Sequence, residues 1–308
     1  MKQSFIRFWL FAALFALPLA GCAFAGANSA PSFPAYSASP LIEPSSRAKG
    51  TSSDSPEALK EELVIPAKEG NPLVYMTAEI RPEGLERANT ALHLQIAEDH
   101  GFADIAPVDI LDAAGEMALP VKGGAHLTEN RVGAGLADYD FCIVLSHFKG
   151  QSTGGYSGVI RNASIGFASV PGKCLIHTAG ADDASWRGGE AAAFLESTAE
   201  AAKSIADYFD HGENIVYIHV LNHLSVDCDC RSHPAEPDMH DIGILASADP
   251  VALEQASVDL VFSAPDRETL SRRIKEGEGL HSLEYGEQIG LGSRSYRLVS
   301  LDEKEGSS

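Results

Sequence analysis

The chain has 308 residues, with 23 Lys and Arg against 43 Asp and Glu, so its formal charge at neutral pH is -20. Hydrophobic residues make up 44% of the chain and charged residues 21%, which is typical of a folded protein and excludes disorder throughout. The acidic charge repels phosphate backbones and no Lys/Arg cluster is present, so we expect no nucleic-acid partner. Five cysteines are too few for a disulfide-dense scaffold.

Residues 1–21 follow the pattern of an export signal. Lys2 and Arg7 flank the start, and the apolar run over residues 8–19 is too short for a comfortable membrane span. The segment ends in Leu-Ala-Gly-Cys, which resembles bacterial lipoprotein signals in which the cysteine is lipidated and becomes the mature N-terminus. We therefore predict a signal peptide over residues 1–21, lipidation of Cys22, and an exported protein anchored to the membrane of the cell envelope. The alternative is ordinary cleavage after residues 23–25, with Cys22 removed.

The next segment, residues 22–71, is rich in Ser, Ala, Pro and Gly and has no apolar period of 2 or 3.6. We interpret it as a disordered tether. The folded part is then an α/β domain over residues 72–302, followed by an acidic tail over residues 303–308.

Within this domain, apolar runs and helical periodicity alternate along the chain. We expect strands over residues 73–78, 104–111, 117–121, 141–147, 173–178, 214–221, 241–246 and 296–301. We expect helices over residues 82–100, 190–209 and 251–262, the last one starting with Asp249 as N-cap and Pro250 at the first helical position. Such alternation predicts a layered α/β fold with a mostly parallel sheet flanked by helices.

The first candidate site follows the apolar strand over residues 141–147. A strand, a glycine-rich turn and a helix start place backbone N–H groups and cations where an anionic small molecule can dock. The spacing is neither a Walker A motif nor a dinucleotide fingerprint, and the alternative is that the glycines only allow positive φ in a tight connection. The candidate ligand-binding residues are His147, Lys149, Gly154, Gly155, Gly158, Arg161 and Asn162.

The second candidate site is the sequence Asp-Cys-Asp-Cys over residues 227–230. If it is extended, Cys228 and Cys230 point to one side about 7 Å apart, and two thiolates can chelate a transition metal such as iron, nickel or zinc. Further ligands are needed, and we select His177, which, like His147, ends an expected strand. Zinc-ribbon and ferredoxin spacings are missing. A Cys228–Cys230 disulfide or plain buried thiols are the alternatives.

Seven blocks of the sequence, in order, resemble a known family. They are SHFKG at 146–150, GGYSG at 154–158, RNASIG at 161–166, GKCLIH at 172–177, DCDC at 227–230, PAEPDMHDIGILAS at 234–247 and DPVALEQASVDLV at 249–261. The chain is identified over residues 73–302 as a member of the domain of unknown function 362 family, often labelled iron-sulfur-centre proteins. The resemblance implies no defined reaction and no catalytic residues.

The chain also departs from the family pattern. It lacks the cysteine-bearing, ferredoxin-like insertion that many members carry after the counterpart of residues 173–178, so the iron-sulfur label does not transfer through that insert. A strand-helix-strand stretch of the N-terminal half is absent between the counterparts of Glu86 and Asn89, and Gln151 stands where a His is common.

Together, these features lead us to expect an exported, lipid-anchored protein with metal- or cofactor-linked redox chemistry. The competing expectation is a non-catalytic or degenerate module that binds a ligand or a metal.

Overall fold

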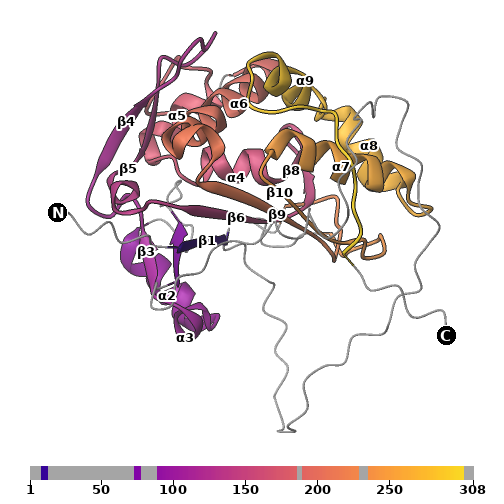
Figure 1. The fold of residues 1–308 in the computed structure, drawn as a ribbon, viewed down its shortest axis with the longest axis horizontal. Coiled ribbons are helices and arrows are strands. Elements are labelled where there is room, and N and C mark those ends of the chain that lie inside the picture. Colours follow the sequence, from indigo (N-terminus) through magenta and orange to yellow (C-terminus); the bar gives the residue numbers. More distant parts are fainter. Residues whose placement is uncertain (1–7, 13–72, 78–88, 186–188, 229–234, 302–308) are drawn as a thin grey trace, which may run out of the picture.

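The computed structural model describes residues 8–12, 73–77, 89–185, 189–228 and 235–301 (Figure 1). Most of the expected leader and tether, the acidic tail, Cys22 and Cys230 lie outside the described residues. The expectations that rest on them remain predictions.

A six-stranded sheet organises the domain, in the order β10-β9-β6-β1-β2-β3. Four neighbouring pairs are parallel, and β9 and β10 are antiparallel. Its strands are β1 (Phe8–Ala12), β2 (Leu73–Thr77), β3 (Val108–Ile110), β6 (Cys142–His147), β9 (Ile215–Leu221) and β10 (Gly243–Ser247). Two antiparallel pairs complete the strands: β4 (Glu116–Pro120) with β5 (Glu129–Gly133), and β7 (Lys149–Gln151) with β8 (Gly155–Ser157). The expected α/β class is confirmed, and the strand arrangement is mixed.

Strand β1 was not expected, because it comes from the segment interpreted as a leader. It lies between β2 and β6 and runs parallel to both. Leu10 pairs with Tyr75 on one side and with Ile143 on the other. In the chain as described, this segment therefore joins the two halves of the sheet.

Helices α4, α6 and α7 gather on one side of β6, β9 and β10, whereas α2 and α3 lie beside β3 (Figure 1). Side chains of β9 alternate between buried and half-buried, which is typical of a sheet with one well-covered face. The α-helices are α2 (Thr90–Asp99), α3 (Phe102–Ile105), α4 (Val159–Ile165), α5 (Val170–His177), α6 (Ala191–Tyr208), α7 (Pro250–Ser263), α8 (Glu268–Glu276) and α9 (His281–Gln288). Short 3-10 turns cover Ala134–Asp138 and Asp210–Gly212.

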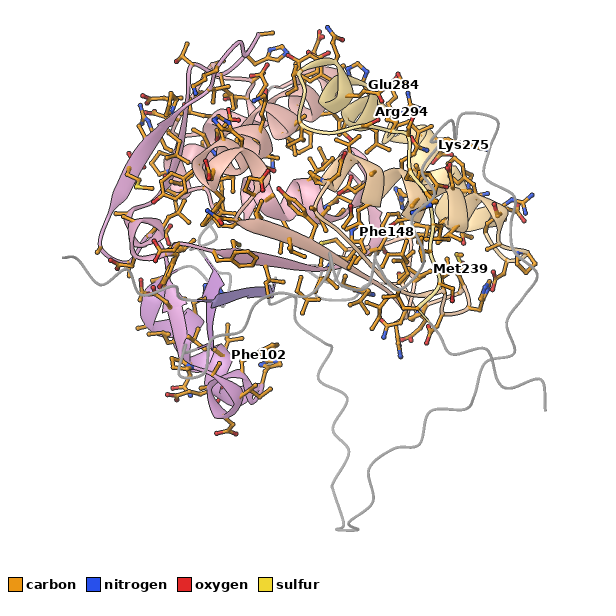
Figure 2. The ribbon with its side chains drawn as sticks, in the orientation of Figure 1. Phe102, Phe148, Met239, Lys275, Glu284 and Arg294 are labelled. Atoms are coloured by element: carbon orange, nitrogen blue, oxygen red, sulfur yellow. The ribbon has the colours of Figure 1, made fainter. Side chains whose placement is uncertain are left out.

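The hydrophobic core has one large and two smaller clusters. The largest packs α4, α6 and α7 against β6 and β9 and includes Val144 and Tyr217. A second cluster includes Phe148 and Met239, both labelled in Figure 2, and lies between β8, α7 and α8. The expected helices over 190–209 and 251–262 are confirmed. The Asp249 carboxylate accepts the N–H groups of Val251 at 2.8 Å and Ala252 at 2.9 Å, which caps α7.

The expected strand over residues 173–178 is wrong, because this segment belongs to helix α5. The Ser169 hydroxyl accepts the N–H of Gly172, and a proline follows in the first turn, so the helix start is fixed before the apolar run begins. A short apolar run does not distinguish a strand from a buried helix, and here the cap decides.

Three further boundaries differ from expectation. Residues 296–301 form no strand, and the Tyr296 hydroxyl instead donates to Asp259 of α7 at 2.9 Å. Residues 104–111 divide between α3 and β3, because Gly101 in a left-handed conformation starts a new turn of helix. The helix expected over 82–100 is described from Thr90, where Asn89 caps α2, and residues 82–88 lie outside the described residues.

None of the helices in the described part of the chain has both the length and the apolar character needed to cross a membrane.

Candidate functional site at the carboxyl ends of β6 and β9

Strands β6 and β9 are parallel and end together, so the segments that follow them share one edge of the sheet. These segments run side by side: the Phe148 N–H donates to Val220 O at 3.0 Å and the Gly150 N–H to Ser225 O at 2.7 Å. We call residues 147–150 and 221–228 the carboxyl edge. In open α/β sheets, ligands bind at this kind of position.

His147 is held at the carboxyl edge by a contact between Nε2 and the carbonyl oxygen of Asn222, at 2.6 Å. A carbonyl oxygen only accepts, so Nε2–H donates to Asn222 O. Histidines that bind metals commonly have their other nitrogen fixed in this way. The His147 ring is therefore oriented by the backbone of the segment that follows β9.

His223, two residues after β9, has φ of 46°, which is unusual for a residue other than glycine. Its N–H donates to the Asp241 carboxylate at 2.8 Å, which holds the strained turn. Our sequence analysis did not single out Asn222 or Asp241. Their only signal in the sequence is their position, because Asn222 directly follows β9 and Asp241 shortly precedes β10.

Cys228 is buried, with 4% of its surface exposed, and is the last residue of the carboxyl edge before the connection to residue 235. Two hydrogen bonds close the base of this loop: Ser225 Oγ donates to Ala235 O at 2.7 Å, and the Ala235 N–H donates to Asp227 Oδ2 at 3.2 Å. Asp227 also faces Arg273 of α8, with Oδ1 3.8 Å from Nη2. Cys228 is therefore buried directly after Asp227, which these contacts hold in place.

The loop also packs tightly on β7. A Cβ on Gly150 would lie 2.3 Å from the carbonyl oxygen of Val226, so only glycine fits there. Cys228 lies two residues beyond Val226, which limits its Cα to about 7 Å from that residue. Lys149, the neighbour of Gly150, is 1% exposed. The structure thus brings Lys149 and Cys228 to the same part of the molecule.

The described residues alone do not supply a metal site. Within them, no group of three or more His, Cys, Asp or Glu side chains is arranged to hold a metal ion. The second thiol of the motif, Cys230, lies in the segment 229–234, outside the described residues.

The glycine-rich segment is the turn of the β7–β8 hairpin. Gly154 and Gly155 have φ of 85° and 79°, values that glycine adopts readily. A Cβ on Gly155 would lie 2.7 Å from the carbonyl oxygen of Ile274. Both glycines are therefore explained by backbone conformation and close packing, which was the alternative left open by the sequence.

The N-terminus of α4 is satisfied by buried side chains of the protein itself. His219 Nε2 accepts the N–H of Val159 at 3.1 Å, and Glu254 Oε1 accepts the N–H of Ile160 at 2.7 Å. A Cβ on Gly158 would lie 2.6 Å from both of these acceptor atoms. These groups occupy the position where an anion would meet the start of a helix.

The protonation state of His219 follows from its partners. The Ser257 hydroxyl donates to Leu253 O at 2.8 Å, so it accepts from His219 Nδ1, also at 2.8 Å. Both ring nitrogens are then satisfied in the neutral ring. Burial, with a smaller contribution from His147, lowers the pKa of His219 to about 3.

Glu254 is the carboxyl group of this buried network. Its Oε2 accepts the hydroxyl of Tyr156 at 2.6 Å, and the Tyr156 ring stacks on Phe148 with 5.2 Å between centroids. Burial raises the pKa of Glu254 to about 7, although the bonds from Tyr156 and Ile160 lower it. Glu254 and Tyr156 were missed by the sequence analysis because their partners are distant in the chain.

Arg161 and Asn162 have local structural partners. Arg161 Nη1 donates to the carbonyl oxygen of Thr153 in the hairpin turn at 2.9 Å, and the guanidinium lies 5.1 Å from the Phe194 ring centroid. Asn162 Nδ2 donates to Ser146 Oγ of β6 at 2.7 Å, in the interior. Asn162 therefore ties α4 to the central strand, and Arg161 ties α4 to the hairpin.

His177 ends helix α5, not a strand, so the reason for placing it at the carboxyl edge is wrong. Its Nδ1–H donates to Lys173 O at 2.8 Å, and its ring lies 4.9 Å from that of Phe194 in α6. Burial lowers its pKa to about 4, against the hydrogen bond to Lys173. The ring is neutral at physiological pH.

A separate charged cluster joins the β4–β5 connection to α6 and α9. The two oxygens of Glu196 contact His126 Nε2 at 2.5 Å and His281 Nε2 at 2.8 Å. One turn further along α6, Glu200 accepts the Tyr285 hydroxyl at 2.7 Å and backbone N–H groups of residues 125–127. This cluster fixes the hairpin tip and α9 to α6.

The family comparison supports the resemblance drawn from the sequence. A family model described as domain of unknown function (DUF362) matches residues 55–259, which is more than half of the chain. The chain belongs to this family. Comparisons with curated proteins and with solved structures gave no match.

Proposed function

We propose that this protein is an exported lipoprotein, anchored to the membrane through lipid on Cys22, whose α/β domain binds a transition metal in support of redox chemistry. The layered, mostly parallel part of the sheet serves as the scaffold, and the ligand site is the carboxyl edge. The observation that carries this proposal is the burial of Cys228 at the carboxyl edge, next to Asp227, which is bonded to the Ala235 N–H.

In this proposal, Cys228 and Cys230 supply thiolate ligands for iron, nickel or zinc. His147 replaces His177 as the histidine candidate, because its ring is oriented at the same edge by Asn222. The described residues alone form no complete ligand set.

The test is the metal content of the full chain purified without oxygen. We expect stoichiometric metal in the parent protein, loss of metal in Cys228→Ser, and retention in Cys174→Ser, which removes a buried thiol of α5 as a matched control. Binding should weaken as pH falls, because ligation requires thiolates. A folded parent protein without metal would overturn the metal assignment.

The anchor is tested separately by mass spectrometry of the membrane fraction. We expect a lipid-modified N-terminus at Cys22 and release of the domain in Cys22→Ser. An unmodified N-terminus beyond residue 22 would disprove the lipoprotein assignment.

A second candidate is a non-catalytic or degenerate module that binds an anionic small molecule. The observation that favours it is the buried Lys149 at the carboxyl edge, whereas the start of α4 is already occupied by Glu254 and His219. Lys149 and Arg161 are then the remaining cationic candidates. Calorimetric titration with inorganic phosphate and with citrate, on parent protein and Lys149→Met, distinguishes this module from a metal protein.

A further inference from the structure

Strand β1 has an unusual position for a segment that export would remove. It lies inside the sheet, paired over Phe8 to Leu10 with β2 and over Leu10 to Ala12 with β6. If processing occurs at Cys22, as proposed above, the mature protein loses one inner strand. The consequence depends on whether the two neighbouring strands keep their places.

The β6 side of this position is held by contacts that do not involve β1. Strand β6 pairs with β9 along its whole length, from Cys142 to His147. Asn162 of α4 bonds to Ser146, and Val144 lies fully buried in the largest core cluster. Removal of β1 therefore leaves β6 in the body of the domain.

The β2 side is held through β3. Tyr75 to Thr77 pair with Val108 to Ile110, and the chain after β3 is tied to the body by the Gly135 N–H, which donates to Leu111 O at 2.9 Å. Gly133 packs so closely on Leu111 that a Cβ there would lie 2.3 Å from the Leu111 backbone. The Tyr139 hydroxyl also donates to Asp109. Strand β3 is thus fixed without help from β1.

The two sides are then two strand spacings apart, about 9.5 Å, which leaves room for one extended chain. We propose that removal of the leader opens a strand-wide slot between β2 and β6, and that this slot binds an extended apolar segment of a partner polypeptide in parallel orientation. This inference rests on the proposed processing at Cys22. It adds peptide binding by strand addition to the proposed function.

The chemistry of the guest segment follows from the slot. Along Ile143 to Leu145, the backbone N–H and C=O groups of alternate residues face it and the others face β9, so the guest must supply a backbone with no proline among the paired residues. Ile143 and Val144 are both buried although they point to opposite faces, so a guest beside them is expected to be apolar on both faces. The leader sequence Phe-Trp-Leu-Phe-Ala itself meets both requirements.

The test begins with the full chain, in which Leu10→Pro should disrupt β1. Hydrogen exchange is expected to become at least about tenfold faster at those N–H groups of Ile143 to Leu145 that face β1, because proline removes a ladder donor from an inner strand. Leu17→Pro, in the same leader but outside β1, is the matched control. Equal exchange in the two variants would show that β1 does not fill the slot.

The second part uses the chain that starts at residue 22, with Cys22→Ser, and a labelled peptide of residues 5–14. We expect saturable binding, at least about tenfold weaker binding of the Leu10→Pro peptide, and no comparable binding of a peptide with reversed sequence. If the shortened chain does not fold alone, folding on addition of the peptide replaces binding as the measurement. Failure of the peptide to bind or to restore folding would overturn the inference.

Two other outcomes would also overturn it. Equal binding of forward and reversed peptides would indicate non-directional hydrophobic contact. Protection of Ile143 to Leu145 in the shortened chain without peptide would show that the chain's own tether fills the slot. The peptide assay uses a chain that already starts at residue 22, so its result does not depend on whether the protein is processed at Cys22. Processing at Cys22 is tested separately, by mass spectrometry of the N-terminus.

Discussion

Replacing Glu254 by Gln tests whether this buried carboxyl titrates in the folded protein. Glu254 accepts the Ile160 N–H and the Tyr156 hydroxyl in a site from which water is excluded. Burial raises its pKa to about 7, from 4.5 for an exposed glutamate. Gln keeps the size of the side chain and an acceptor oxygen but has no charge at any pH.

The sign of the effect follows from linkage. A carboxyl with a raised pKa contributes its full stabilisation below about pH 4.5, and this is lost as pH rises through 7. Between pH 5 and pH 8 the loss is roughly 2.5 kcal/mol, because one pKa unit corresponds to about 1.36 kcal/mol. His219 acts in the opposite direction. Its pKa is lowered to about 3, so its stabilisation is present above pH 6.5 and is lost as pH falls.

The measurement is therefore a difference between two proteins that both retain His219. Urea unfolding at pH 5 and pH 8, followed by circular dichroism, gives the free energy of unfolding for the parent and for Glu254→Gln. We expect the parent to lose roughly 2.5 kcal/mol relative to the variant between these pH values. Glu276→Gln, on the exposed surface of α8, is the control for the change in charge. If the free energies of unfolding of the parent and Glu254→Gln differ by the same amount at pH 5 and pH 8, the raised pKa of Glu254 is refuted.

Two further substitutions test the packing and the charged cluster. Gly158→Ala places a methyl carbon 2.6 Å from the Glu254 carboxylate, so we expect a loss of about 1 to 3 kcal/mol in the free energy of unfolding, measured with urea. Glu196→Gln weakens the contacts to His126 and His281, and we expect a loss of at most about 1 kcal/mol because the group is partly exposed. Burial raises the pKa of Glu196 but the two histidine bonds lower it further, so the deficit of this variant should disappear as pH falls below about 4.5. An unchanged urea midpoint of unfolding for Gly158→Ala would contradict the packing argument. A loss of unfolding free energy in Glu196→Gln that becomes larger as pH falls would contradict the argument on the charged cluster.

Much of the fold can be predicted from local patterns. The apolar run that forms β6 and the alternating run that forms β9 are visible in the sequence, because a buried strand requires apolar residues at fixed spacing. Helix α7 is predicted together with its cap, since Asp249 and the following proline act within a single turn. Membership of the family was also evident, and the family model confirms it.

The candidate site was only partly predictable. His147 could be selected because it ends a buried strand, and the structure adds its orientation by Asn222. His177 was selected by the same reasoning and fails it, because α5 is a helix whose start depends on the Ser169 cap. Cys228 could be identified by residue type, whereas the closure of its loop through Ala235 depends on folding.

The sequence by itself therefore determined those helices and strands whose sequence patterns lie within one or two turns of the chain. It also showed which residue types are able to bind a ligand. Tertiary structure decided the rest. The start of α4 is bound by His219, 60 residues away, and by Glu254, 94 residues from its partner Ile160. Strand β1 acquires its place only through pairing with β2 and β6. Such contacts leave no local pattern in the sequence. Each contact satisfies a buried N–H group or an open strand edge, and these exist only after the distant segments have packed together.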